Sequence, residues 1–296
     1  MYFEHKELLK IPVFRAAYSD RTAWLMAEMS KLAYLKFEQA DSKYEELKNV
    51  LNEANFELLK TFSNGGTQAF LAKREDDGIA CLAFRGTEKE DIRDIIADLD
   101  ARFYKNDKGE KIHNGFNLAF KIAEPEIRDA LQNVGKCTPY VTGHSLGGAL
   151  ALIATKTFNS DNLAACYTFG SPKVGSSDFA DTIKPPIYRI VNSIDPVPFL
   201  PYPDVWEFFI SIFKNSQWKW LSNIMKKSEG YTHHGDMRYL TVCKEDFSDL
   251  RLIYNYNDNS RFAEFLKNKK IAVRNHAIEI YCRKLEAYAW DRLHQK

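Results

Sequence analysis

Residues 140–154 read Y-V-T-G-H-S-L-G-G-A-L-A-L-I-A and place a serine between two glycines in the pattern G-x-S-x-G. The β-branched pair Val141 and Thr142 precedes this serine, and an Ala/Leu-rich stretch of helical character follows it. A serine on such a sharp strand-to-helix turn projects its Oγ out of the sheet into an open site. The pattern therefore predicts that Ser145 is a nucleophile.

The two glycines that flank Ser145 indicate crowding around the turn. A side chain at Gly143 or Gly147 is expected to collide with the neighbouring strand or helix. The start of the following helix also points free N–H groups, notably that of Leu146, towards negative charge that develops on a substrate oxygen. The alternative is a Gly-rich turn without catalytic function, and the strand before it and the helix after it disfavour that interpretation.

A serine nucleophile needs a base within hydrogen-bond reach and a carboxylate that fixes the tautomer of that base. Where a serine occupies this kind of turn, the acid and then the histidine follow it in the chain. Apart from a histidine near the C-terminus, the candidates are His233, His234 and His276. We favour His276 because it directly precedes a helical stretch, and this junction can place an imidazole over the sheet edge. His233 and His234 remain the alternative, and a surface or capping role is common for any single histidine.

Asp195 is the strongest candidate for the acid. It lies in R-I-V-N-S-I-D-P-V-P and follows a predicted strand at 187–191, at the carboxyl end where the sites of α/β proteins gather. An ordinary Asp-Pro turn is the alternative. Asp178, Asp181 and Asp204 are weaker rivals because none of them directly follows a strand pattern.

A second donor to an oxyanion is expected from the loop after an earlier strand. The run C-L-A-F-R-G-T ends a predicted strand at Phe84, and Gly86 permits close approach of the backbone. Thr87 offers both its N–H and its hydroxyl at this point. A simple strand-to-loop turn is the alternative.

The elements that must position these residues alternate between helix and strand patterns. Helical patterns cover residues 23–37, 44–59, 116–131, 146–158 and about 276–293. Strand patterns cover 67–72, 79–84, 139–142, 165–169, 187–191 and 238–242, of which the first two predict a hairpin. This order predicts an α/β fold with a mostly parallel central sheet and helices on both faces. We expect a single domain over 1–296, with N-terminal helices at 1–60 packed on it.

The composition excludes several classes of protein. Lys and Arg number 41 against 40 for Asp and Glu, without a basic stripe, so we expect no nucleic-acid partner. Five cysteines without C-x-x-C spacing suit buried thiols, and we expect no metal and no cofactor. No run approaches the about 20 apolar residues of a transmembrane segment. The N-terminal residues carry no Sec-type signal, so a soluble protein in the cytoplasm or exported by another route is expected.

Six segments of the chain together resemble the class 3 lipases, a family of α/β-hydrolases that includes fungal triacylglycerol lipases and bacterial relatives. These segments are A-F-R-G-T at 83–87, H-N-G-F at 113–116, V-T-G-H-S-L-G-G-A-L at 141–150, Y-T-F-G-S-P-K-V-G at 167–175, R-I-V-N-S-I-D-P-V-P at 189–198 and N-H-A-I-E-I-Y at 275–281. The resemblance implies an α/β-hydrolase fold with the triad Ser145, Asp195 and His276. It further implies an oxyanion hole at Thr87 and Leu146, and a non-catalytic histidine in Y-T-H-H-G.

The activity implied by the resemblance is that of a serine carboxylester hydrolase, a lipase or esterase, which cleaves acylglycerol ester bonds. A lipid or ester substrate is expected. A phospholipase of the same fold is one alternative, because the motifs define the acyl chemistry but not the head group. A catalytically inactive lipid-binding module is another, and an intact triad disfavours it.

Two segments are candidates for a lid over the site. Residues 88–104 are amphipathic and directly follow the predicted oxyanion loop, where fungal relatives keep their lid. Residues 205–229 are rich in Trp and Phe, lie between the predicted acid and base, and suit transient contact with a lipid interface. A helix packed permanently on the core is the alternative for the first segment, and a buried helical hairpin for the second.

Overall fold

The central strands alternate their apolar side chains between two faces. In β2 (Thr67–Arg74), Leu71 packs into one core cluster, whereas its neighbour Phe70 packs into the other. β3 (Ile79–Phe84) divides its six buried residues between the two clusters in the same way. Successive side chains of a strand point to opposite faces, so strands that are apolar on both faces must be covered on both.

The computed structural model describes residues 1–12, 17–87, 103–105, 109–200, 230–257, 260, 261, 264 and 274–294. Both lid hypotheses, at 88–104 and 205–229, lie outside the described residues, apart from the backbone of residues 103 and 104. Asp204 lies outside them as well.

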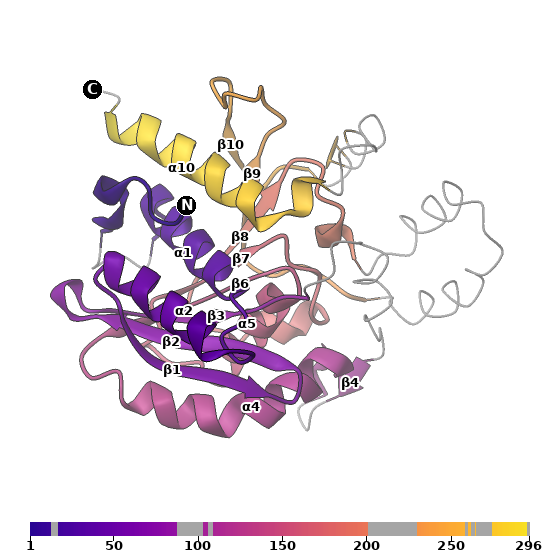
Figure 1. The fold of residues 1–296 in the computed structure, drawn as a ribbon. Helices are drawn as coiled ribbons and strands as arrows, with labels where there is room; N and C mark the ends of the chain where they lie inside the picture. The colour runs from indigo at the N-terminus through magenta and orange to yellow at the C-terminus, as the bar shows by residue number, and fades with distance from the viewer. Residues whose placement is uncertain are drawn as a thin grey trace.

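Among the described residues, the main sheet has eight strands in the order β1-β2-β3-β6-β7-β8-β9-β10 (Figure 1). Neighbouring strands from β3 to β9 are parallel, and the pairs at the two edges are antiparallel. The remaining main-sheet strands are β1 (Glu57–Asn64), β6 (Thr138–His144), β7 (Ala165–Phe169), β8 (Ile187–Asn192), β9 (Asp236–Leu240) and β10 (Leu252–Tyr254). A separate antiparallel pair joins β4 (Phe103–Lys105) to β5 (Lys111–His113).

Helices cover both faces of this sheet. One cluster contains the buried faces of α4 (Asn114–Gln132) and α5 (Leu146–Thr157). The other contains those of α1 (Asp20–Leu32), α2 (Asp41–Glu53) and α10 (Ile278–His294), and α10 runs alongside α1 (Figure 1). The 3-10 turns are Lys6–Leu9, Glu75–Asp77, Ser177–Ala180, Val197–Phe199 and Arg274–His276. The predicted mostly parallel sheet with helices on both faces is confirmed.

The sequence patterns were wrong at several element boundaries. The helix predicted over 44–59 ends at Glu53, and β1 begins at Glu57. Phe62 is the one fully buried residue of β1, so this edge strand lacks the apolar alternation that identifies a strand. The sequence patterns also failed to predict β4, β5 and β10. Each of these strands has only three residues, too few to show an alternation of apolar and polar side chains.

The cysteines are free thiols, and all except Cys243 are buried, as their apolar surroundings predict. In the described ranges, no helix combines the length and the apolar character that crossing a membrane requires. The same ranges contain no group of three His, Cys, Asp or Glu side chains arranged to hold a metal ion.

Helix α5 crosses β3 and β6 at a distance that excludes side chains. A Cβ at Gly143 would lie 2.1 Å from the carbonyl oxygen of Gly147. A Cβ at Gly147 would lie 2.4 Å from the carbonyl oxygen of Phe84. The expected collisions at both glycines are therefore confirmed, and because the atoms that block the space belong to the backbone, they cannot turn aside.

We predict that Gly147→Ala lowers the free energy of unfolding by about 1–3 kcal/mol or more, because α5 must move away from β3. Gly115 is a matched control: it is also the second residue of a helix, and a Cβ there would find its nearest neighbour at 3.5 Å. Gly115→Ala should change the stability by about 1 kcal/mol or less. Urea titration of both variants measures the difference, and equal effects would contradict the proposed crowding.

Candidate active site

Ser145 occupies the turn between β6 and α5 in a strained conformation. Its backbone angles are φ 56° and ψ −128°, in the positive-φ range that side-chain-bearing residues rarely adopt. The Ser145 N–H donates a hydrogen bond of 2.9 Å to the carbonyl of Phe169 in β7. The strands on either side thus hold the turn in place and present Oγ at the carboxyl edge of the sheet.

The structure brings Ser145, His276 and Asp195 together, although 131 residues separate the first two and 81 the last two. The Ser145 Oγ lies 2.9 Å from His276 Nε2. His276 Nδ1 lies 3.0 Å from each oxygen of the Asp195 carboxylate. These distances are hydrogen-bond distances, and they form a continuous chain from the carboxylate to the hydroxyl.

The partners of the His276 ring determine its tautomer. An ionised carboxylate can only accept a hydrogen bond, so Nδ1 carries the proton and Nε2 offers its lone pair to the Ser145 hydroxyl. This is the orientation that a general base requires.

Asp195 is completely buried, and its charge is compensated by hydrogen bonds. The Val197 N–H donates to Oδ1 at 2.9 Å, and the Tyr281 hydroxyl donates to Oδ2 at 2.5 Å. Burial, together with the neighbouring Asp195 charge, raises the pKa of Tyr281 well above its usual value. The phenol therefore remains protonated and remains a donor.

The rival residues make other contacts. His233 Nε2 donates to the carbonyl of Pro198, and His234 Nε2 lies 3.5 Å from the Thr232 hydroxyl. Asp178 accepts a hydrogen bond from the Ser176 hydroxyl. These hydrogen bonds do not involve Ser145 or His276.

The loop after β3 runs directly against the Ser145 turn. A Cβ at Gly86 would lie 3.2 Å from Ser145 Cβ and 2.6 Å from the His144 carbonyl oxygen. Arg85 anchors this loop through two hydrogen bonds of 3.0 and 2.6 Å to the carboxylate of Glu38. Thr87 follows Gly86 immediately. The participation of its hydroxyl in an oxyanion hole stays a prediction.

Leu146 is the first residue of α5, so its backbone N–H has no acceptor within the helix. The N-terminal end of a helix also carries partial positive charge. Both properties are those of an oxyanion donor next to the nucleophile.

Two residues that support the site were missed by the sequence patterns. His144 Nε2 lies 2.6 Å from the His276 carbonyl oxygen, and its Nδ1 lies 2.8 Å from the Tyr34 hydroxyl. A carbonyl only accepts, so Nε2 must carry the proton and Nδ1 must accept from Tyr34. Both partners lie more than 100 residues away, and no local pattern could reveal them.

Gly170 is a third such residue. Its φ is +54°, and a Cβ there would lie 2.5 Å from Asp195 Oδ2 and 3.1 Å from His276 Nδ1. The backbone directly after β7 therefore passes close to Asp195 and His276. Gly170 belongs to the segment T-F-G-S-P, which is part of the resemblance to class 3 lipases. The sequence alone does not show which side chains this glycine approaches.

Comparisons with known proteins agree with this geometry. Residues 81–205 match the family described as Lipase (class 3). The lipase of Rhizomucor miehei is 33% identical over 165 residues, 50% of this chain and 45% of that protein. The secreted mono- and diacylglycerol lipase 1 of Fusarium solani is 37% identical over 98 residues, 30% of this chain and 29% of its own length. This chain therefore spans less than half the length of these two relatives.

The fold has counterparts among solved structures. The lipase from Rhizopus microsporus var. chinensis superimposes with a TM-score of 0.62 and 22% identity, covering 92% of each chain. A largely parallel sheet with a serine on a strand-to-helix turn, followed by aspartate and histidine from later loops, defines the α/β-hydrolase fold. Residues 81–205 are thus similar to the class 3 lipases, as the motif segments within this range predict.

We predict that the His144 imidazole, with its proton on Nε2, stays neutral in the pH range around 6.5 where an ordinary histidine gains its charge. Burial lowers its pKa well below the usual 6.5, and the charge of His276 adds to this effect. The ring ¹⁵N chemical shifts measure its state. The same ring in urea-unfolded protein should titrate near the ordinary value of about 6.5. A midpoint near this value in the folded protein would contradict the prediction.

Proposed function

We propose that this protein is a serine carboxylester hydrolase that cleaves acylglycerol ester bonds through an acyl-enzyme on Ser145. The observation that carries the proposal is the hydrogen-bonded chain from Asp195 through His276 to the Ser145 Oγ. The family relationship supports a lipid ester as substrate, since one relative is named a mono- and diacylglycerol lipase.

In the first half of the reaction, the Ser145 Oγ attacks the ester carbonyl carbon and its proton passes to His276 Nε2. The Leu146 N–H, with Thr87, stabilises the negative charge that forms on the carbonyl oxygen. Asp195 stabilises the positive charge on the imidazolium. Collapse of the tetrahedral intermediate expels the alcohol, which takes the proton from His276 and leaves the acyl group on Ser145.

In the second half, a water molecule attacks the acyl-enzyme while His276 Nε2 accepts its proton. The same oxyanion donors stabilise the second tetrahedral intermediate. Its collapse releases the fatty acid and returns the proton to Ser145 Oγ. His144 stays neutral because of its lowered pKa, and therefore does not compete with His276 for the transferred proton.

Two alternatives are separated by a direct assay. A phospholipase would share every step above, and an inactive lipid-binding module would share the fold. Purified protein is incubated with a triglyceride emulsion, phosphatidylcholine vesicles and p-nitrophenyl butyrate. The proposal expects hydrolysis of the triglyceride and of the short ester, a preference for phospholipid would support the phospholipase, and no turnover would support the inactive module.

We predict that Ser145→Ala and His276→Ala each lower kcat on p-nitrophenyl butyrate by about 10⁴–10⁶-fold, because both remove a member of one catalytic unit. His233→Ala and His234→Ala serve as matched controls and should retain substantial turnover. The thermal unfolding temperature of each variant verifies its fold. A Ser145→Ala enzyme within tenfold of wild type would exclude the mechanism, and a reversed ranking of the histidines would move the base to the His233/His234 loop.

Thr87→Val is predicted to lower kcat by about 10²–10³-fold with little change in KM, because a hydroxyl that binds the oxyanion acts mainly in the transition state. Thr87→Ser keeps the hydroxyl and should be much milder. Steady-state kinetics on a soluble ester measure both. Normal kcat in Thr87→Val would exclude a role for the hydroxyl.

A further inference from the structure

Lys284 is a buried cation in the middle of α10, with only 4% of its surface exposed. Its ammonium donates hydrogen bonds of 2.8 Å to Asn192 Oδ1 and 2.7 Å to the Thr241 carbonyl, and it also contacts the Cys243 thiol. It forms no ion pair with a carboxylate of the described chain. Lysine is rarely buried without such a pair, because its desolvation is costly. Its position therefore requires an explanation beyond core packing.

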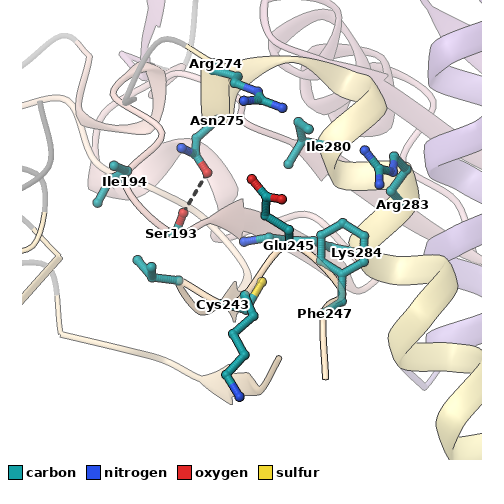
Figure 2. Close-up of a pocket in the computed structure, with 12 residues that line it drawn as sticks. Ser193, Ile194, Cys243, Glu245, Phe247, Arg274, Asn275, Ile280, Arg283 and Lys284 are labelled. Atoms are coloured by element: carbon teal, nitrogen blue, oxygen red, sulfur yellow. Dashed lines mark hydrogen bonds between the residues drawn. The ribbon is translucent and has the colours of Figure 1, made fainter. Parts of the chain in front are cut away.

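The Asn192 side chain connects Lys284 to the loop that carries His276. The Asn192 Nδ2 donates to the Asn275 carbonyl at 2.8 Å, and Asn275 directly precedes His276. The Ser193 hydroxyl adds a hydrogen bond of 3.0 Å to Asn275 Oδ1, drawn as the dashed line in Figure 2. The residue before the base is thus held from the end of β8.

The Asn192 backbone connects to the acid. Its carbonyl accepts from the Asp195 N–H at 2.8 Å, and its N–H donates to the Tyr281 hydroxyl at 3.0 Å. That hydroxyl donates in turn to Asp195 Oδ2. Asn192 therefore contacts both loops that meet in the triad, and Lys284 lies one helical turn beyond Tyr281.

We propose that Lys284 is a positioning residue for the triad: its ammonium fixes the orientation of the Asn192 amide, and that amide holds the His276 loop at its distance from Asp195. An ammonium can only donate, so it forces Oδ1 of Asn192 towards itself and leaves Nδ2 directed at Asn275. Without that donor, Oδ1 keeps only the longer hydrogen bond of 3.4 Å from the Ser193 hydroxyl, so the amide holds the carbonyl of Asn275 less firmly.

The surroundings of Lys284 make this role accessible to experiment. A cavity of about 370 Å³ is lined by Lys284, Cys243, Glu245, Asn275 and Arg283, among others (Figure 2). Arg283 and Arg274 on its wall are exposed, so the cavity opens at the protein surface. A small cation can therefore enter and replace a deleted lysine ammonium.

The first test compares Lys284→Met with Arg283→Met, which removes a neighbouring exposed cation of the same cavity wall. This kinetic readout depends on the proposed ester hydrolysis. Lys284→Met should lower kcat by about 10- to 100-fold with KM changed less than about twofold, because a displaced imidazole affects the transition state. Arg283→Met should remain near wild type. Unchanged kcat in Lys284→Met would overturn the proposal, as would a loss that follows the unfolding temperature alone.

The second test is chemical rescue. Lys284→Ala removes three methylene groups and the ammonium, and n-propylammonium supplies the same atoms through the cavity. The rate at which a fluorophosphonate labels Ser145 should rise with propylammonium concentration and saturate, whereas propan-1-ol of similar size should have no effect. Equal rescue by both compounds, or rescue by neither, would exclude the ammonium as the active group.

The third test does not require turnover. The proton between His276 Nδ1 and Asp195 should give a low-field ¹H NMR signal in wild type and in Arg283→Met. In Lys284→Met this signal should shift or broaden. If wild type hydrolysed no ester, the proposed function would fail, and this comparison would still test the positioning role. An unchanged signal in Lys284→Met would overturn it.

Discussion

The close contact of α5 with β3 and β6 is the constraint on which the site depends. Gly143 and Gly147 allow backbone atoms to meet where a Cβ would lie 2.1 and 2.4 Å from a carbonyl oxygen. Within this space, the chain turns from strand to helix with Ser145 at a positive φ. That conformation is unfavourable by about 1–3 kcal/mol. The close packing of α5 and the hydrogen bond from the Ser145 N–H to Phe169 in β7 hold it in place. Ser145 is thus positioned by contacts with neighbouring strands and with α5, beyond its own turn.

Burial and hydrogen bonds fix the orientation of the Asp195 carboxylate and of the His276 ring. Asp195 is fully enclosed, and each of its oxygens has a donor besides His276, so the carboxylate cannot rotate away from the imidazole. A buried carboxylate is stable only with such a set of partners, and charge interactions are stronger where water is excluded. On the other side, His144 holds the His276 backbone while remaining uncharged, because burial lowers its pKa. The base is therefore fixed by polar contacts that add no competing charge.

The sequence was sufficient to predict features that depend on residues close together in the chain. The turn at Ser145, the hairpin of β2 and β3, and the strand before Asp195 follow from glycine placement and residue periodicity. The edge strands β1 and β10 were not predicted, because neither shows an alternation of buried and exposed residues. β1 has a single buried residue, and β10 is only three residues long. His144, Gly170 and Lys284 could not be assigned, because their roles depend on partners that only the folded sheet brings near. The lid hypotheses fall on residues outside the described ranges and stay predictions.

The proposed mechanism requires that His276 activates Ser145 as a nucleophile. Mass spectrometry of the digested protein after brief treatment with a fluorophosphonate tests it most directly, because this reagent forms a covalent bond only with an activated serine. We expect a single adduct on the peptide that contains Ser145. The adduct should be absent after prior unfolding and strongly reduced in Asp195→Asn, where the tautomer of His276 is no longer fixed. An adduct on a different residue, or no adduct on folded wild-type protein, would contradict the proposed mechanism.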